Sequence, residues 1–272
     1  MTSPRRETGF ARVNGARLYY EVAGAGRPLV LLHAGIADCR MWDEQVDAFA
    51  LRHRAVRYDL RGFGRSDMPP GPFAHHDDLR GLLRALGVAR AHVLGLSLGG
   101  GVALACALAH PEMVTALIPV AAGAGGGDPP AALLRRWEEI EAVAKVGDLA
   151  RAVEIELQLW VDGPLRAPDQ VDPAVRERVR EMNTAIFQRE VRNQGTPRPL
   201  EPPAHLRLHE IRAPTLVIVG DHDQPATVAG ADLLARGIAG AGKVVIPGVA
   251  HMVNMERPAH FNRLVLDFLQ RL

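Results

Sequence analysis

The chain has 272 residues, of which 47% are hydrophobic and 23% are charged, and its formal net charge is +1. This length fits one large α/β domain, or a core with an insertion, and is enough to bury a core without disulfides or structural metals. The near-neutral charge argues against nucleic-acid binding, which needs a concentrated basic surface. Two cysteines, Cys39 and Cys106, form no disulfide framework, and no run approaches the roughly 18 apolar residues of a membrane span. Because the first residues also lack an apolar signal-peptide core, we expect a soluble cytoplasmic protein that binds neither nucleic acid nor membranes.

Short apolar runs alternate with helical patterns in the first half of the chain and return near its end. The alternation predicts an α/β fold, in which helices cover both faces of a mostly parallel, doubly wound sheet. The runs predict strands at 17–22, 28–32, 55–58, 92–95, 114–120, 214–219 and 243–246, and the helical spacing predicts helices at 76–86, 97–110 and 258–269.

The pattern changes between a glycine-rich stretch at 123–130 and a proline-rich stretch that ends at Pro203. Between these breakers the apolar residues recur at helical spacing, and no segment reads convincingly as a strand. We therefore predict two sequence pieces of one core, 1–127 and 206–272, separated by a helical insertion at 128–205.

The segment Gly95-Leu96-Ser97-Leu98-Gly99 follows a predicted buried strand and opens a predicted helix. A serine on so sharp a strand-to-helix turn occupies a strained backbone position, and its neighbours must be small to avoid the adjacent strand and helix. The helix N-terminus also presents free N–H groups toward a developing negative charge. Ser97, one of only three serines in the chain, is therefore the predicted nucleophile; the alternative is a glycine-rich turn that contains a serine by chance.

A serine nucleophile needs a base, and in a parallel sheet the active groups lie at the carboxyl ends of strands. His251 follows the predicted strand 243–246 after a short turn and is the predicted base. The acid that orients it should follow the preceding strand, where Asp221 and Asp223 compete. Asp223 is favoured, since Asp221 can instead accept backbone N–H groups of the turn. The order Ser97, Asp223, His251 matches one known triad topology.

An oxyanion hole needs two N–H donors. One is expected at Leu98, directly after the nucleophile, and the other at Gly35, where a residue without a side chain lets the backbone approach the substrate. His33, two residues before Gly35, is expected to order this loop rather than to act as a base.

These motifs together resemble those of the α/β-hydrolase fold family. The matching stretches are Leu31 to Gly35 with Trp42, the turn from Asp59 to Ser66, the serine elbow, Gly220 to Asp223, and His251 followed by Glu256 and Pro258. The chain is most similar to the 3-oxoadipate enol-lactonase-like and small-carboxylesterase branch, in which the insertion at 128–205 corresponds to a helical cap, or lid. Family members with aspartate at the elbow are dehalogenases or epoxide hydrolases, and Ser97 argues against both.

The resemblance implies hydrolysis of a small-molecule carboxylic ester or lactone through an acyl-enzyme, without a metal or an organic cofactor, by a monomer or homodimer. Alternatives that keep the triad are a C–C bond hydrolase and a perhydrolase or acyltransferase; a slow-turnover ligand sensor belongs to a different class. The substrate is expected between core and cap. Candidate pocket residues, for which plain packing is the competing interpretation, are Ile36, Trp137, Trp160, Met182 and Met252.

Overall fold

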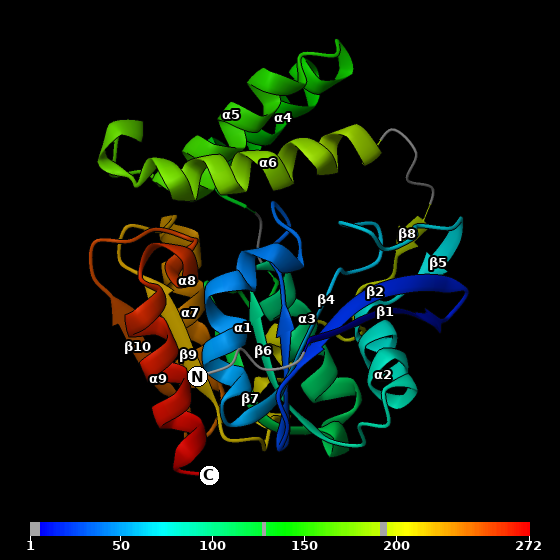
Figure 1. Cartoon of the computed structure of the whole chain (residues 1–272). Coiled ribbons are helices and arrows are strands. Elements are labelled where there is room, and N and C mark those ends of the chain that lie inside the picture. The colour runs from blue at the N-terminus through cyan, green and yellow to red at the C-terminus, as the bar shows by residue number, and fades with distance from the viewer. Residues whose placement is uncertain (1–5, 127–128, 191–194) are drawn as a thin grey trace.

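The computed structural model describes residues 6–126, 129–190 and 195–272, and its centre is an eight-stranded sheet (Figure 1). The strand order is β1-β2-β4-β3-β6-β7-β9-β10; β2 pairs antiparallel with β1 and β4, and the other pairs are parallel. The predicted fold class is therefore confirmed. The strands of this sheet are β1 (Arg6–Val13), β2 (Ala16–Ala23), β3 (Arg27–Leu32), β4 (His53–Tyr58), β6 (Ala91–Leu96), β7 (Val114–Val120), β9 (Leu216–Gly220) and β10 (Gly242–Ile246).

The central strands are apolar throughout because helices cover both faces of the sheet. In β3, Leu29 and Leu31 belong to one buried cluster, whereas Val30 and Leu32 belong to the cluster on the opposite face. Residues of α1 and α9 join the first cluster, and residues of α2, α3 and α7 join the second. These helices are α1 (Asp43–Ala50), α2 (His75–Ala85), α3 (Leu98–Ala109), α7 (Pro225–Gly237) and α9 (Pro258–Gln270), with the short α8 (Val253–Glu256) before α9.

Three further helices form a layer across one end of the sheet (Figure 1). They are α4 (Ala131–Lys145), α5 (Leu149–Leu157), which continues into one π-helical stretch at Gln158–Asp162, and α6 (Pro173–Glu190). Their apolar faces share a buried cluster with residues that follow β3 and β10, so this layer packs against the edge where those strands end. None of the helices in the described ranges is long and apolar enough to cross a membrane.

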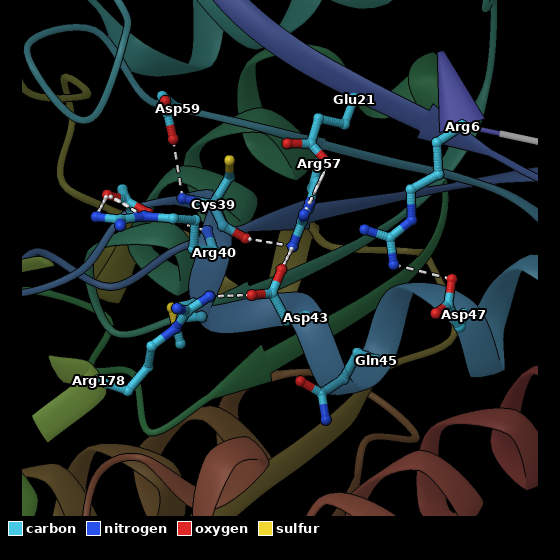
Figure 2. A network of polar contacts seen from close by, with 12 residues as sticks. Arg6, Glu21, Cys39, Arg40, Asp43, Gln45, Asp47, Arg57, Asp59 and Arg178 are labelled. Atoms are coloured by element: carbon cyan, nitrogen blue, oxygen red, sulfur yellow. Dashed lines mark hydrogen bonds and ion pairs between the residues drawn. The ribbon is translucent and has the colours of Figure 1, made fainter. Parts of the chain in front are cut away.

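A polar network also ties α6 to the sheet (Figure 2). Asp43, the first residue of α1, accepts hydrogen bonds from Arg178 of α6 and from Arg57 of β4. Arg57 is 3% exposed, and it donates in addition to Glu21 at 2.7 Å. Because two carboxylates face this buried guanidinium, its charge is compensated, and the pairing links the helical layer to the core.

The structure contains elements that the sequence patterns did not predict, namely β1, α1, α7, and a separate two-stranded parallel sheet. That sheet pairs β5 (Gly71–Phe73) with β8 (Gly195–Pro197). The expectation that the insertion contains no strand is therefore wrong: the last part of the insertion contains β8, which pairs with β5, the strand that follows β4 in the chain. A three-residue strand containing Gly195 and Pro197 has no periodicity of its own, since only its partner defines it.

Candidate active site

Ser97 lies at the turn between β6 and α3, and its φ of 55° and ψ of −114° confirm the predicted strained conformation. The turn depends on its two glycines. A Cβ at Gly95 would lie 2.1 Å from Gly99 O, and a Cβ at Gly99 would lie 2.3 Å from Leu32 O. Since both obstacles are backbone atoms, no larger residue fits at either position without moving the chain. The turn leaves Ser97 partly exposed at the carboxyl edge of the sheet.

Asp223 and His251, which follow β9 and β10 at the same edge, are in contact. His251 Nδ1 lies 2.8 Å from Asp223 Oδ2, and both side chains are buried, at 4% and 1% exposure. An ionised carboxylate only accepts, so Nδ1 carries the hydrogen and donates it, which leaves Nε2 as the basic nitrogen. Asp223 Oδ1 accepts the N–H of Gln224 at 2.7 Å, so the carboxylate is held on both oxygens.

Ser97 Oγ makes no hydrogen bond to His251 among the contacts of the described residues. A contact between nucleophile and base is often loose until substrate is bound, so this geometry is compatible with both roles. What the fold provides is a shared edge: β6, β7, β9 and β10 run parallel, and Ser97, Asp223 and His251 follow the first, third and fourth of these strands.

Two neighbouring polar residues have structural partners instead. Asp221 Oδ1 accepts the N–H of Gly248 at 2.7 Å, so Asp221 closes the turn after β10. His33 is fully buried; its Nε2 accepts the N–H of Leu60 at 2.9 Å, and its Nδ1 lies 2.8 Å from Ala34 O. Burial lowers the pKa of His33. The neutral imidazole therefore holds the loop in place through both ring nitrogens.

The two predicted oxyanion donors are neighbours in space. A Cβ built on Gly35 would lie 3.7 Å from the Cβ of Leu98, so the loop after β3 lies beside the start of α3. Leu98 is the first residue of α3, where a helix has no internal acceptor for the N–H group. The loop is anchored by the hydrogen bond from Gly99 N–H to His33 O at 3.1 Å. The arrangement can present two N–H groups beside Ser97.

Trp160, in the π-helical stretch, lies against the candidate base. Its ring centroid is 4.7 Å from that of His251, and its carbonyl accepts the backbone N–H of His251 at 3.3 Å. π-helical turns are rare and occur mainly at functional sites. Here the turn brings a side chain of the helical layer onto the imidazole.

A buried ion pair stabilises the contact between the π-helical stretch and the turn that carries His251. Arg166 pairs with Glu256, and their side chains are 8% and 7% exposed. Arg166 also donates to the carbonyl oxygens of Val161 and Asp162 in the π-helical stretch and of Gly248 in the turn before His251. Glu256 accepts the N–H of Ala250 at 3.0 Å. One charged pair therefore joins the helical layer to the turn that carries His251.

The remaining pocket candidates fall into two groups. Trp137 is 39% exposed and lines a cavity of about 410 Å³ that also reaches Gly35. Ile36, Met182 and Met252 are 8%, 0% and 0% exposed and belong to the buried cluster between the helical layer and the core. The side chains of the two methionines are completely enclosed by their packing neighbours.

Two groups in the described part of the chain could offer three ligand atoms to a metal ion: His76, Asp77 and His110, and Asp38, Cys39 and Asp59. Their carboxylates already have protein partners. Asp77 lies 3.0 Å from His110 Nε2, Asp38 pairs with Arg40, and Asp59 accepts the N–H of Cys39 at 2.9 Å. Neither group includes a residue of the candidate site.

Asn183 was not predicted from the sequence, although it lines the same cavity as Gly35 and Trp137. A signal was present: Asn183 falls four residues after Val179 and three before Ile186, on the apolar stripe of α6. A polar residue at such a position is buried at a cost unless something binds it. Arg166 was missed as well, because its partners lie 82 and 90 residues away.

A parallel sheet with a strained serine elbow, a buried Asp–His pair at its carboxyl edge and helices across that edge defines a hydrolase of the α/β class. The sequence profile described as alpha/beta hydrolase fold matches residues 27–258. The chain therefore belongs to the alpha/beta hydrolase fold family, and it is a hydrolase.

Known relatives cover nearly the whole chain. A protein of Azorhizobium caulinodans named "Putative carbamate hydrolase RutD" is 31% identical over 95% of this chain and 97% of its own length. A 2-hydroxy-6-oxononadienedioate/2-hydroxy-6-oxononatrienedioate hydrolase of Paraburkholderia phymatum is 30% identical over 93% and 91%. The crystal structure of the enol-lactonase from Burkholderia xenovorans LB400 matches with a TM-score of 0.80 and 29% identity, over 96% of this chain and 100% of that one. The relatives are thus hydrolases of several substrate types.

Proposed function

We propose that this protein hydrolyses a small-molecule carboxylic ester or lactone through an acyl-enzyme formed on Ser97. The observation that carries the proposal is the buried 2.8 Å contact of Asp223 with His251, at the sheet edge where Ser97 is held at positive φ. The likeness to a solved enol-lactonase supports an ester or lactone as the substrate. The helical layer, α4 to α6, acts as the lid over the substrate.

In the first half-reaction Ser97 Oγ attacks the carbonyl carbon while His251 Nε2 takes its proton. Asp223 accepts the Nδ1 hydrogen throughout, which fixes the tautomer and stabilises the imidazolium. The N–H groups of Leu98 and Gly35 donate to the oxyanion. The tetrahedral intermediate then collapses, and His251 returns the proton to the leaving oxygen. An ester substrate thereby releases its alcohol, whereas a lactone opens to a hydroxyl that stays attached to the acyl group; in both cases an ester to Ser97 remains.

In the second half-reaction a water molecule attacks this ester and gives a proton to His251. The second tetrahedral intermediate releases the carboxylic acid and restores the Ser97 hydroxyl, which recovers its proton from His251. The chemistry needs no group beyond these side chains, two backbone N–H groups and water.

The direct test is Ser97→Ala, assayed for hydrolysis of p-nitrophenyl butyrate with the fold checked by circular dichroism. Activity should fall to background while the spectrum stays unchanged; substantial residual turnover would refute the proposal. Steady multiple turnover by the unaltered protein is also required. A single stoichiometric burst would identify the ligand sensor instead.

The chain offers a matched pair of variants for the acid. Asp223→Asn should lower kcat by about 10³- to 10⁴-fold, because the imidazole is then held in the wrong tautomer. Asp221→Asn, two residues away, should leave kcat within a few-fold, since the Asp221 carboxylate accepts the N–H of Gly248 in the turn after β10. A larger loss at Asp221 than at Asp223 would overturn the assignment.

A second candidate is C–C bond hydrolysis with the same residues, which the relative from Paraburkholderia phymatum favours. A panel of esters, lactones and vinylogous diketones separates the two by kcat/KM. The ester and lactone proposal requires the highest values in the first two groups; a higher value for a diketone would replace it with the second candidate.

A further inference from the structure

The cavity of about 410 Å³ joins the oxyanion loop to the helical layer. Gly35 contributes the loop side, and α4 and α6 contribute a mainly apolar wall that includes Trp137, Ile186 and Phe187. Among the described lining residues, none comes from the turn that carries His251. Because the leaving oxygen must lie beside His251 to receive its proton, a substrate that reaches this cavity would place its acyl part there.

Asn183 of α6 is a polar side chain buried in this wall. It is 2% exposed, and its Oδ1 has no hydrogen-bond partner within the described part of the chain. A buried amide oxygen without a partner destabilises a protein, and such a group calls for a specific explanation. A leucine would fit the apolar stripe of α6 without this cost, so packing alone does not explain the asparagine.

The charges around the cavity indicate what would complement Asn183. Lys145, the only cation among the described lining residues, pairs with Glu141 at 2.8 Å, so these residues offer an anionic acyl group no cation that is not already paired. An amide oxygen accepts hydrogen bonds, so its complement is a donor. Burying a neutral donor in a mainly apolar wall costs less than burying a charged one, so the complement is a neutral donor.

We propose that Asn183 is a specificity-determining residue whose Oδ1 accepts a hydrogen bond from a neutral donor, an amide N–H or a hydroxyl, in the acyl part of the substrate. The assignment rests on the proposed ester or lactone hydrolysis. The preferred substrates are then esters or lactones with a polar, uncharged acyl group. A site that holds a hydrogen-bonding group discriminates against analogues that lack the donor, because the buried acceptor stays unpaired.

The test compares three p-nitrophenyl esters of equal acyl length: the hexanoate, the N-acetyl-β-alaninate, which carries an N–H donor, and the N-methyl analogue of the latter, which does not. The unaltered protein should show a kcat/KM about tenfold higher for the N–H ester than for its N-methyl analogue. Asn183→Leu should abolish that preference by lowering the value for the N–H ester about tenfold, with hexanoate hydrolysis retained.

Ile186→Val is the matched control, since Ile186 lines the same cavity from the same helix and should affect all three esters alike. Retained hexanoate activity shows that a variant is folded, and Asn183→Ala replaces Asn183→Leu if the latter does not fold. The assignment is overturned if the unaltered protein does not prefer the N–H ester, or if the preference survives in the Asn183 variants. Hydrolysis that persists in Ser97→Ala would refute the catalytic proposal instead, so the two failures are distinguishable.

Discussion

Replacing Gly99 with alanine should destabilise the protein, although alanine is the better helix former. The added Cβ would lie 2.3 Å from Leu32 O and 2.7 Å from His33 O, where contacts closer than about 3.0 Å are essentially never seen. The chain would have to move by about 0.7 Å, and the atoms in the way belong to the backbone of Leu32, the last residue of the buried strand β3, and of His33, which follows it. Overpacking of this kind costs about 3 kcal/mol, against about 1 kcal/mol gained in helix propensity. The free energy of unfolding should therefore fall by about 2 kcal/mol.

Gly101, two residues further along α3, provides the control, since a Cβ there meets nothing within 4 Å. Gly101→Ala should raise the free energy of unfolding by about 1 kcal/mol, so the two variants should differ by about 3 kcal/mol in urea titrations. Gly99→Ala should also slow p-nitrophenyl butyrate hydrolysis about 100-fold, because moving the loop displaces the Gly35 donor. A Gly99→Ala protein as stable and as active as Gly101→Ala would show that the close approach of Leu32 O does not require glycine at position 99.

Two further perturbations test the buried charges and the buried imidazoles. Arg166→Met should lower the free energy of unfolding by about 3–5 kcal/mol, because Glu256 then stays buried without its partner. Adding Glu256→Gln to this variant should recover part of that loss. If the losses of the two single variants simply add in the double variant, the two side chains are not coupled. Burial lowers the pKa of His92 from 6.5 to about 4, so between these pH values the unfolded chain binds a proton that the folded chain does not. The free energy of unfolding should therefore fall as the pH drops from 6.5 toward 4, and His92 should contribute up to about 1.4 kcal/mol per pH unit to this fall. Urea titrations between pH 7.5 and 4.5 give the free energy of unfolding as a function of pH. Its slope should be shallower for His92→Gln than for the unaltered protein and unchanged for the exposed His209→Gln. Equal slopes for the two variants would show that His92 does not contribute to the pH dependence of stability.

Seven of the eight strands of the sheet and the serine elbow were predictable because their signals are local. The apolar run at 28–32 has few alternatives to a strand buried on both faces, and Gly95 and Gly99 flank Ser97 at the spacing that the sharp turn requires. One of the missed elements, β8, depends on a distant partner. β8 exists only because residues 195–197 lie beside β5, and no periodicity within three residues reports that.

For the site, local sequence patterns place a serine after β6, two aspartates after β9 and a histidine after β10. The contacts of these side chains appear only in the folded chain, where Asp223 reaches the His251 ring whereas Asp221 closes a turn. The same holds for the helical layer, where Trp160 lies on the imidazole and Asn183 enters the cavity wall. A strand or a tight turn is set by neighbouring residues, whereas the direction of a side chain across a cleft is set by elements far apart in the chain.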